Sequence, residues 1–137
     1  MEYHTKELTI TVRPDDIIEI ATNKNFKGEY SIEAVAENLA TFEKAVDGKV
    51  RATLLHFPDH YVKKEVMKGY ANSEISTAAT ALFAKSFASK LIGNLFLSLR
   101  KRLVQSRTIP PTKVFTDKKN AIEWLLKHIE AHKQQQS

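Results

Sequence analysis

The side chains best suited to chemistry lie in two short segments of the chain. The first segment supplies His56, Asp59, His60 and Tyr61, which follow a short apolar run. Imidazole and carboxylate groups bind metals, but ligands spread over a strand end and a loop rarely converge on one ion. Open α/β sheets bind their ligands beyond the carboxyl ends of the strands. We therefore expect a partner-binding edge here and no metal.

The second segment combines two hydroxyl and two ammonium groups, from Lys85, Ser86, Ser89 and Lys90. It falls at the expected start of a helix, where unpaired backbone N–H groups attract anions. This makes it a candidate site for a small anionic molecule, such as a phosphate or a lipid head group. The alternative is that Ser86 only caps the helix while the lysines face water. No glycine-rich phosphate loop accompanies the segment.

Other common catalytic arrangements are missing from the sequence. The chain has no cysteine, which excludes disulfides, thiolate nucleophiles and cysteine zinc sites. It also has no G-x-S-x-G nucleophile elbow. His128 and His132 are four residues apart, but the run H-I-E-A-H between them is not the H-E-x-x-H zinc motif. We therefore expect a protein that is not an enzyme and that carries no cofactor.

Length and charge narrow the class of protein further. A chain of 137 residues fits a single domain over residues 1–137. The net charge is +5, but several cations stand at helix ends, where they complement the helix dipole, so no nucleic-acid partner is expected. No apolar stretch approaches the roughly 20 residues that span a bilayer, and no signal-peptide run begins the sequence. The expectation is a cytoplasmic protein.

The remaining sequence must supply the elements that position these two segments. Alternating apolar residues predict half-buried strands, and apolar residues every three or four positions predict amphipathic helices. Breaks between elements are marked by Pro14, Gly48, Pro58 and Pro110. The expected strands are residues 7–13, 16–22, 50–57, 77–84 and 112–115; the expected helices are 31–47, 61–70, 86–103 and one capped by Asp117, with a frayed tail at 133–137.

The order of elements predicts an α/β fold with a mixed sheet of four to five strands. The first two strands form an antiparallel hairpin, and the later strands, separated by helices, should pair in parallel through right-handed crossovers. In the helix 86–103, apolar residues recur every four positions and are expected to form one broad buried stripe. These residues are Phe87, Leu91, Leu95, Leu99 and Leu103.

The second half of the chain resembles a bacterial family. An alanine-rich segment is followed by SFASKLIGNLFL and then by PTKVFTDKKNAIEWL. The last run fits the pattern P-T-x-x-F-x-[DS]-x-x-x-A-x-x-W-L of the family usually described as SpoIIAA-like or STAS-like. The resemblance covers residues 7 to 130 in element order and is specific from Ala79 onward. The matching residues are Pro111, Thr112, Phe115, Asp117, Ala121, Trp124 and Leu125.

This resemblance implies a SpoIIAA-like fold, a right-handed β/α superhelix around a sheet of four or five strands. The best-known relatives are anti-sigma-factor antagonists and transporter-associated domains that work by docking on a partner. They commonly carry a phosphorylatable serine at the start of the helix after a central strand. The corresponding position here falls in residues 57–61, which contain no serine or threonine. The kinase-operated switch of those relatives is therefore not expected.

Two functions remain as expectations. The first is a non-catalytic, STAS-like regulatory or protein-interaction domain. Its partner, another protein or a second copy in a homodimer, would dock at the edge bearing His56 to Tyr61. The alternative, from another class, is a binder of a small anionic or lipidic ligand at the helix start formed by Lys85 to Lys90.

Overall fold

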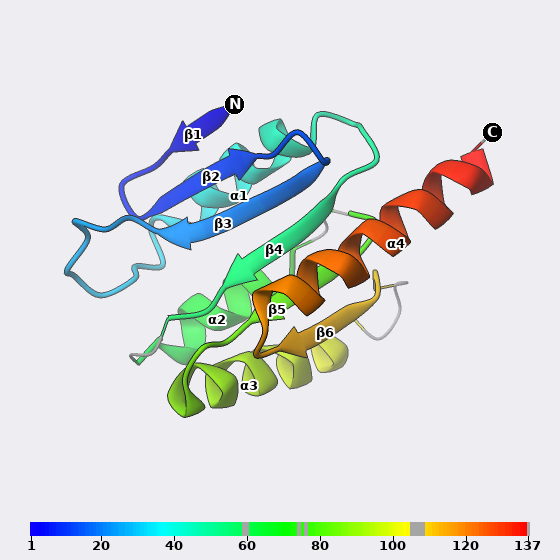
Figure 1. Cartoon of the computed structure of the whole chain (residues 1–137). Helices are drawn as coiled ribbons and strands as arrows, with labels where there is room; N and C mark the ends of the chain where they lie inside the picture. The colour runs from blue at the N-terminus through cyan, green and yellow to red at the C-terminus, as the bar shows by residue number, and fades with distance from the viewer. Residues whose placement is uncertain (59–60, 74, 76, 105–108, 137) are drawn as a thin grey trace.

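The computed structural model describes residues 1–58, 61–73, 75, 77–104 and 109–136 (Figure 1). It alternates strands and helices after an initial run of three strands. The strands are β1 (Glu2–His4), β2 (Leu8–Val12), β3 (Ile17–Thr22), β4 (Ala52–His56), β5 (Thr80–Phe83) and β6 (Thr112–Phe115). The helices are α1 (Val35–Val46), α2 (Lys64–Ala71), α3 (Phe87–Leu103) and α4 (Lys118–Gln136).

The strands described form one six-stranded sheet whose order in space is their order in the sequence. The strands β1, β2 and β3 pair antiparallel, whereas β3 to β6 are parallel. This confirms the predicted α/β fold with a leading hairpin and parallel strands after it. The sheet is one strand larger than expected, because β1 is too short to show a period-two pattern. The strand β1 forms the edge of the sheet and pairs with β2, with Tyr3 opposite Ile10.

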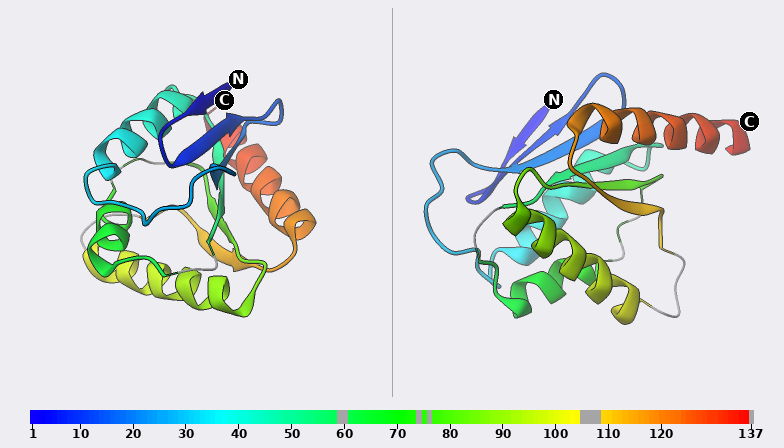
Figure 2. Two further views of the ribbon diagram at one scale, coloured as in Figure 1. Left: turned by 90° about the vertical axis from the view of Figure 1, so that its left-hand side faces the viewer. Right: turned by 60° about the horizontal axis from the view of Figure 1, so that its bottom comes forward.

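Helices cover both faces of the sheet, but unequally. The helices α1, α2 and α3 lie on one face and α4 lies alone on the other (Figure 2). Strands that are added in one direction through crossovers of one hand place their connecting helices on the same face. The helix α4 follows the last strand and returns across the opposite face.

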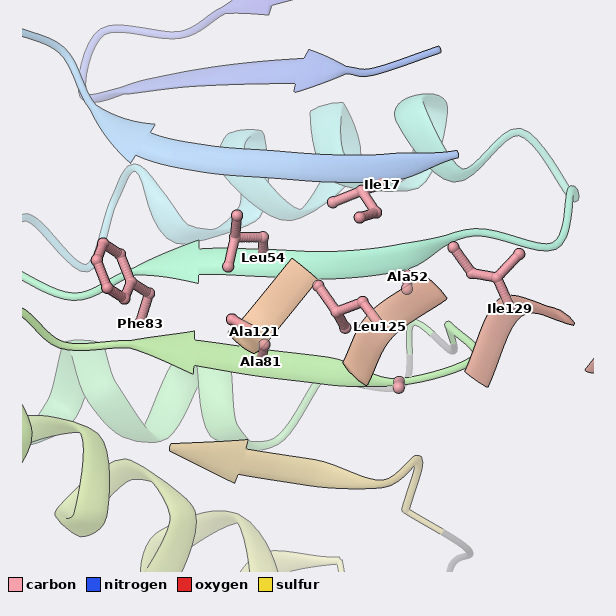
Figure 3. Packing of buried hydrophobic residues seen from close by; sticks show 9 residues of the cluster. Ile17, Ala52, Leu54, Ala81, Phe83, Ala121, Leu125 and Ile129 are labelled. Carbon is pink, nitrogen blue, oxygen red and sulfur yellow. The ribbon is translucent and has the colours of Figure 1, made fainter. Parts of the chain in front are cut away.

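The packing of α4 on the sheet forms a large part of the core. Three of its side chains, Ala121, Leu125 and Ile129, lie over the centre of the sheet (Figure 3). They meet small or branched side chains of the central strands, including Ala81 and Leu54, which are fully buried. Alanine on both surfaces lets the helix approach the sheet closely, and leucine and isoleucine fill the remaining space.

Some of the predicted helix ends and caps match the structure and others do not. Asp117 caps α4, because its Oδ1 accepts from the N–H groups of Lys119 and Asn120. The prediction that the helix α1 starts at residue 31 was wrong. That helix begins at Val35 without a side-chain cap, and the Ser31 side chain instead closes the preceding turn and contacts a buried carboxylate. The helix α4 continues to residue 136, through most of the tail expected to fray.

The outer face of α3 contradicts another prediction. Of the stripe expected to be buried, Phe87 is 78% exposed, Leu91 55% and Leu95 53%. The helix turns a different side to the sheet, and Gly93 lies there with Val114 about 3.8 Å from where its Cβ would be. The side chains that the helix buries are those of Ser89, Phe96 and Leu99, together with Gly93. Apolar residues occur on two faces of this helix, and only the inner one is covered among the described residues.

Candidate functional site

A cavity of about 170 Å³ lies between the sheet and the layer formed by α1, α2 and α3. We call it the sheet–helix cavity. Its volume exceeds the roughly 150 Å³ of an apolar cavity that binds benzene. Its wall is largely apolar and is drawn from both layers: Ile20 and Leu55 from the sheet, Leu39 and Phe42 from α1, Met67 from α2 and Phe96 from α3.

Three threonines in one row of the sheet line the floor of the sheet–helix cavity. Thr53, Thr80 and Thr112 are register partners on β4, β5 and β6, and all three line the cavity. Their side chains are short where leucine or phenylalanine would reach toward the helices. The Thr53 hydroxyl also donates to the Thr77 hydroxyl at 3.3 Å. The cavity therefore results from residue size in one row of the sheet.

A buried polar network adjoins the cavity, built on Glu7. This carboxylate is only 2% exposed and precedes β2. Its Oε2 accepts from the Ser31 N–H at 2.9 Å, and its Oε1 accepts from Asn38 Nδ2 at 3.1 Å. The same Asn38 nitrogen donates to the Tyr70 hydroxyl at 2.7 Å, so one chain of hydrogen bonds joins the start of β2 to α1 and α2. Asn38 and Tyr70 both line the cavity.

Tyr70 presents a neutral phenol at neutral pH. Burial raises the pKa of Tyr70 above 10.0, and the nearby Glu7 carboxylate raises it further, against the opposing effect of the Asn38 hydrogen bond. Its O–H has no acceptor among the described residues. Asn38 Oδ1 is likewise buried without a partner in that part of the chain. Because the Asn38 nitrogen faces a carboxylate, the amide cannot be turned to relieve this.

The two groups together leave one donor and one acceptor unused beside an apolar space. A buried polar group without a hydrogen bond, as Asn38 Oδ1 is here, costs about 1–3 kcal/mol, so a molecule that donates to this oxygen would gain free energy on entry, and the half-buried Tyr70 O–H can donate to the same molecule. An alcohol or a primary amide can donate and accept at once. The geometry therefore fits a small apolar molecule that carries one neutral hydrogen-bonding group.

In the segment from Lys85 to Lys90, which was predicted to bind an anion, the two serines mainly cap the helix α3. Ser86 caps α3, since its Oγ accepts from the Ser89 N–H at 3.0 Å and Ser89 Oγ accepts from the Ser86 N–H at 2.9 Å. The predicted cap is thus confirmed, and both hydroxyls are committed to it. Lys85 and Lys90 are exposed. Binding of an anion there stays a prediction.

The predicted partner-binding edge is described only in part. Asp59 and His60 lie outside the described residues, and the Tyr61 side chain is exposed. His56 is not free, because its Nε2 is hydrogen-bonded to Glu19 on the neighbouring strand. Its ring also packs edge-on against Phe83, on whose ring Lys85 is placed as well, 6.0 Å from the centroid. The two predicted segments thus adjoin at Phe83.

Neither a metal site nor a membrane span is found in the part of the chain that the structure describes. No three histidine, aspartate or glutamate side chains of those residues lie where they could share an ion. None of the helices there is long and apolar enough to cross a bilayer.

Comparison with known proteins gives one result. Residues 12–129 match the family described as Domain of unknown function (DUF7793). The chain belongs to this family. The match starts at the end of β2 and ends within α4, so it takes in the parallel strands and the helices around the cavity. No curated protein and no solved structure matches the chain.

Three residues of the polar network were missed by sequence reasoning: Asn38 and Tyr70, which lie within the matched range, and Glu7, which precedes it. One of them left a signal. Asn38 stands on the apolar face of α1, three residues after Val35 and four before Phe42, where a polar side chain must find a partner. No comparable pattern marks Glu7, which reads as the first polar residue of an ordinary strand.

On the α4 side of the sheet, the DUF7793 domain holds a second carboxylate, Glu19, among two cations and a histidine. Glu19 Oε2 lies 2.9 Å from Lys118 Nζ and also bonds His56, and its Oε1 lies 3.5 Å from Arg13. Burial favours the neutral acid, but the hydrogen bonds and charges of Lys118 and His56 outweigh it. The pKa of Glu19 therefore lies below 4.5.

We expect Glu19→Gln to lower stability at neutral pH and to lower it less as the solution becomes acidic. A carboxylate whose pKa is lower in the folded state stabilises the fold above its unfolded pKa, and that contribution is lost as the pH falls through the folded pKa. The gap between wild type and variant should thus close below about pH 4.5. Urea unfolding over a pH series measures it, with exposed Glu43→Gln on α1 as the control. A gap that stays constant into acid would contradict the prediction.

Proposed function

We propose that this DUF7793 domain is a non-catalytic binding domain that takes a small, neutral, mainly apolar molecule into the sheet–helix cavity. The observation that carries the proposal is an apolar cavity bordered by an unused donor and an unused acceptor, from Tyr70 and Asn38. This moves the expected ligand site from the start of α3 to the interior. It also changes the expected chemistry from an anion to a neutral molecule.

Benzyl alcohol and toluene test this proposal, because they differ only in one hydroxyl group and are only slightly larger than benzene. Titration is followed by NMR shifts of the methyl groups of Ile20, Leu39 and Leu55, which line the cavity. Both probes should bind, and benzyl alcohol should bind about two- to tenfold more tightly, the gain of one net hydrogen bond. Tyr70→Phe removes one of the two polar partners, so it should reduce that preference and affect toluene binding less.

A matched pair of substitutions locates the binding. Leu55→Phe fills the cavity and should abolish binding of both probes, whereas Leu55→Met conserves volume and should retain it. A thermal melt of each variant shows that it is folded. If neither probe shifts the cavity methyl groups, or if Leu55→Phe binds as well as wild type, the proposal is wrong.

A second proposal keeps the STAS-like interaction domain, with a protein partner or a second copy of the chain. It rests on the sequence signature from Pro111 to Leu125 and on the exposed Tyr61 side chain near the end of β4. Tyrosine is enriched where interfaces form, because it combines a large apolar body with a polar tip. A pull-down that recovers a partner with wild type but not with Tyr61→Ala would support it. Recovery that is equal with both would contradict this edge.

A further inference from the structure

The outer face of α3 carries an apolar strip that no described residue covers. Phe87, Leu91 and Leu95 follow one another at intervals of four, so they lie on one side of the helix, and each is more than half exposed. In both views of Figure 2 this helix lies at the outside of the molecule. Isolated exposed apolar residues are common, but three that are aligned on one face form a contiguous apolar patch, which is typical of an interaction site.

Only cations accompany this strip. The helix contains no aspartate or glutamate, and basic side chains stand at both ends of the strip. No ion pair joins any of these side chains to an acid among the described residues. They are Lys85, Lys90, Lys101 and Arg102, all exposed.

We propose that this face of α3 docks on an anionic membrane surface. A helix that lies in the interface inserts aromatic and leucine side chains among the lipid tails and keeps lysine and arginine at the head groups. Phe87, Leu91 and Leu95 supply the first kind of group, and the flanking cations supply the second. Lys85 and Lys90, which the sequence predicts to bind a lipid head group, would then belong to this larger membrane-binding surface. No separate head-group site is required.

The size and charge of the strip favour a membrane over a protein. Three side chains expose on the order of a few hundred Å² of apolar area, whereas a specific protein interface buries roughly 800 Å² on each partner. A second copy would also bring Lys90 and its neighbours against the same cations, and like charges repel. A bilayer has no minimum patch size, and each cation near an anionic surface strengthens binding about fivefold.

Sedimentation with vesicles tests the proposal on the full chain. We expect binding to vesicles of phosphatidylcholine with about 30% phosphatidylglycerol, little binding to pure phosphatidylcholine, and weaker binding as salt rises. The triple variant Phe87→Ser, Leu91→Ser, Leu95→Ser should lose at least about tenfold in partitioning, because these side chains provide the insertion. As these positions are exposed, the variant should still fold, which circular dichroism checks.

Two controls distinguish membrane binding by this face from nonspecific hydrophobic adsorption and from the effect of the net charge. Leu126→Ser removes an exposed leucine from α4 and should leave partitioning unchanged. Lys90→Glu with Lys101→Glu should weaken binding more than tenfold, whereas the same reversal at Lys64 and Lys68 of α2 should have a smaller effect. Equal partitioning of the α3 variants and wild type would overturn the proposal.

Two other results would also overturn it. One is binding to poly-L-glutamate without binding to anionic vesicles, which would assign the face to an acidic protein. The other is a wild-type dimer in analytical ultracentrifugation that becomes monomeric in the triple serine variant, which would assign the face to a second copy. The cavity proposal is tested by different residues and stands or falls separately.

Discussion

Replacing Glu7 with leucine should lower the free energy of unfolding by about 3 kcal/mol, although leucine is similar in size and the site is buried. The carboxylate is 2% exposed and accepts its two shorter hydrogen bonds from the Ser31 N–H and Asn38 Nδ2, with a longer one from the Ser31 hydroxyl. Leucine accepts none of these bonds, so the half-buried Ser31 N–H loses its partner and Asn38 Nδ2 keeps only its bond to the Tyr70 hydroxyl. Each lost bond costs about 1–3 kcal/mol, and bonds to a charged acceptor are the stronger ones.

Chemical denaturation of three variants tests this account. Glu7→Gln retains one acceptor oxygen but presents an NH₂ group to a donor, so it should cost less than Glu7→Leu and still be measurable. Glu33→Leu, at an exposed position, should change stability by less than about 0.5 kcal/mol.

A double-mutant cycle sharpens the test. Asn38→Leu removes one of the donors that Glu7 satisfies, so the double variant should lose less stability than the two single losses added together. Strict additivity would show that the two side chains do not share a hydrogen bond in solution. A Glu7→Leu variant as stable as wild type would refute the network as a whole.

The fold was predictable from the sequence because its signals are local and agree with one another. Alternation before Pro14, helical spacing before Gly48 and the cap at Asp117 each act within a few residues, and the order of elements then restricts the topology. The segment 77–84 is rich in alanine, a residue type that also suits a helix. It contains the strand β5, and Ala79 and Ala81 lie in the cluster with the side chains of α4, where small side chains allow close packing.

The orientation of α3 could not be predicted for a physical reason. The helix has apolar residues on two faces, one with Phe87, Leu91 and Leu95 and the other with Phe96 and Leu99. Periodicity shows that a helix is amphipathic, but it cannot choose between two apolar faces. The choice depends on how closely the helix approaches the sheet, and Gly93 and the small Ser89 lie on the side that does so.

The cavity and its polar network could not be predicted from the sequence either, because they depend on how the strands align and on how the helices pack on them. Thr53, Thr80 and Thr112 are separated by more than 25 residues from one to the next and become neighbours only when three strands align. In the same way, Glu7 meets Asn38 only because α1 folds back over β2. Local patterns can report that a residue is buried, but the partners of a buried polar group are set by tertiary structure.

Leu125→Ala should lower the free energy of unfolding by about 3 kcal/mol, within the range of 2–5 kcal/mol for truncation of a buried leucine. Leu125 is fully buried at the centre of the contact between α4 and the sheet, beside Leu54 and Ala81 (Figure 3). The strands below it are paired on both sides and cannot move into the space. The cost therefore includes a cavity as well as the lost transfer of the side chain from water.

The next residue of α4 provides a matched control for this prediction. Leu126 has the same side chain on the same helix but is 38% exposed, so Leu126→Ala should cost less than about 1 kcal/mol. The difference between the two variants measures the packing of α4 alone, because their helix propensities are equal. Urea denaturation at neutral pH gives both values. Equal losses at the two positions would mean that α4 does not rest on the sheet in this orientation, and the Lys118–Glu19 contact would then have no structural basis.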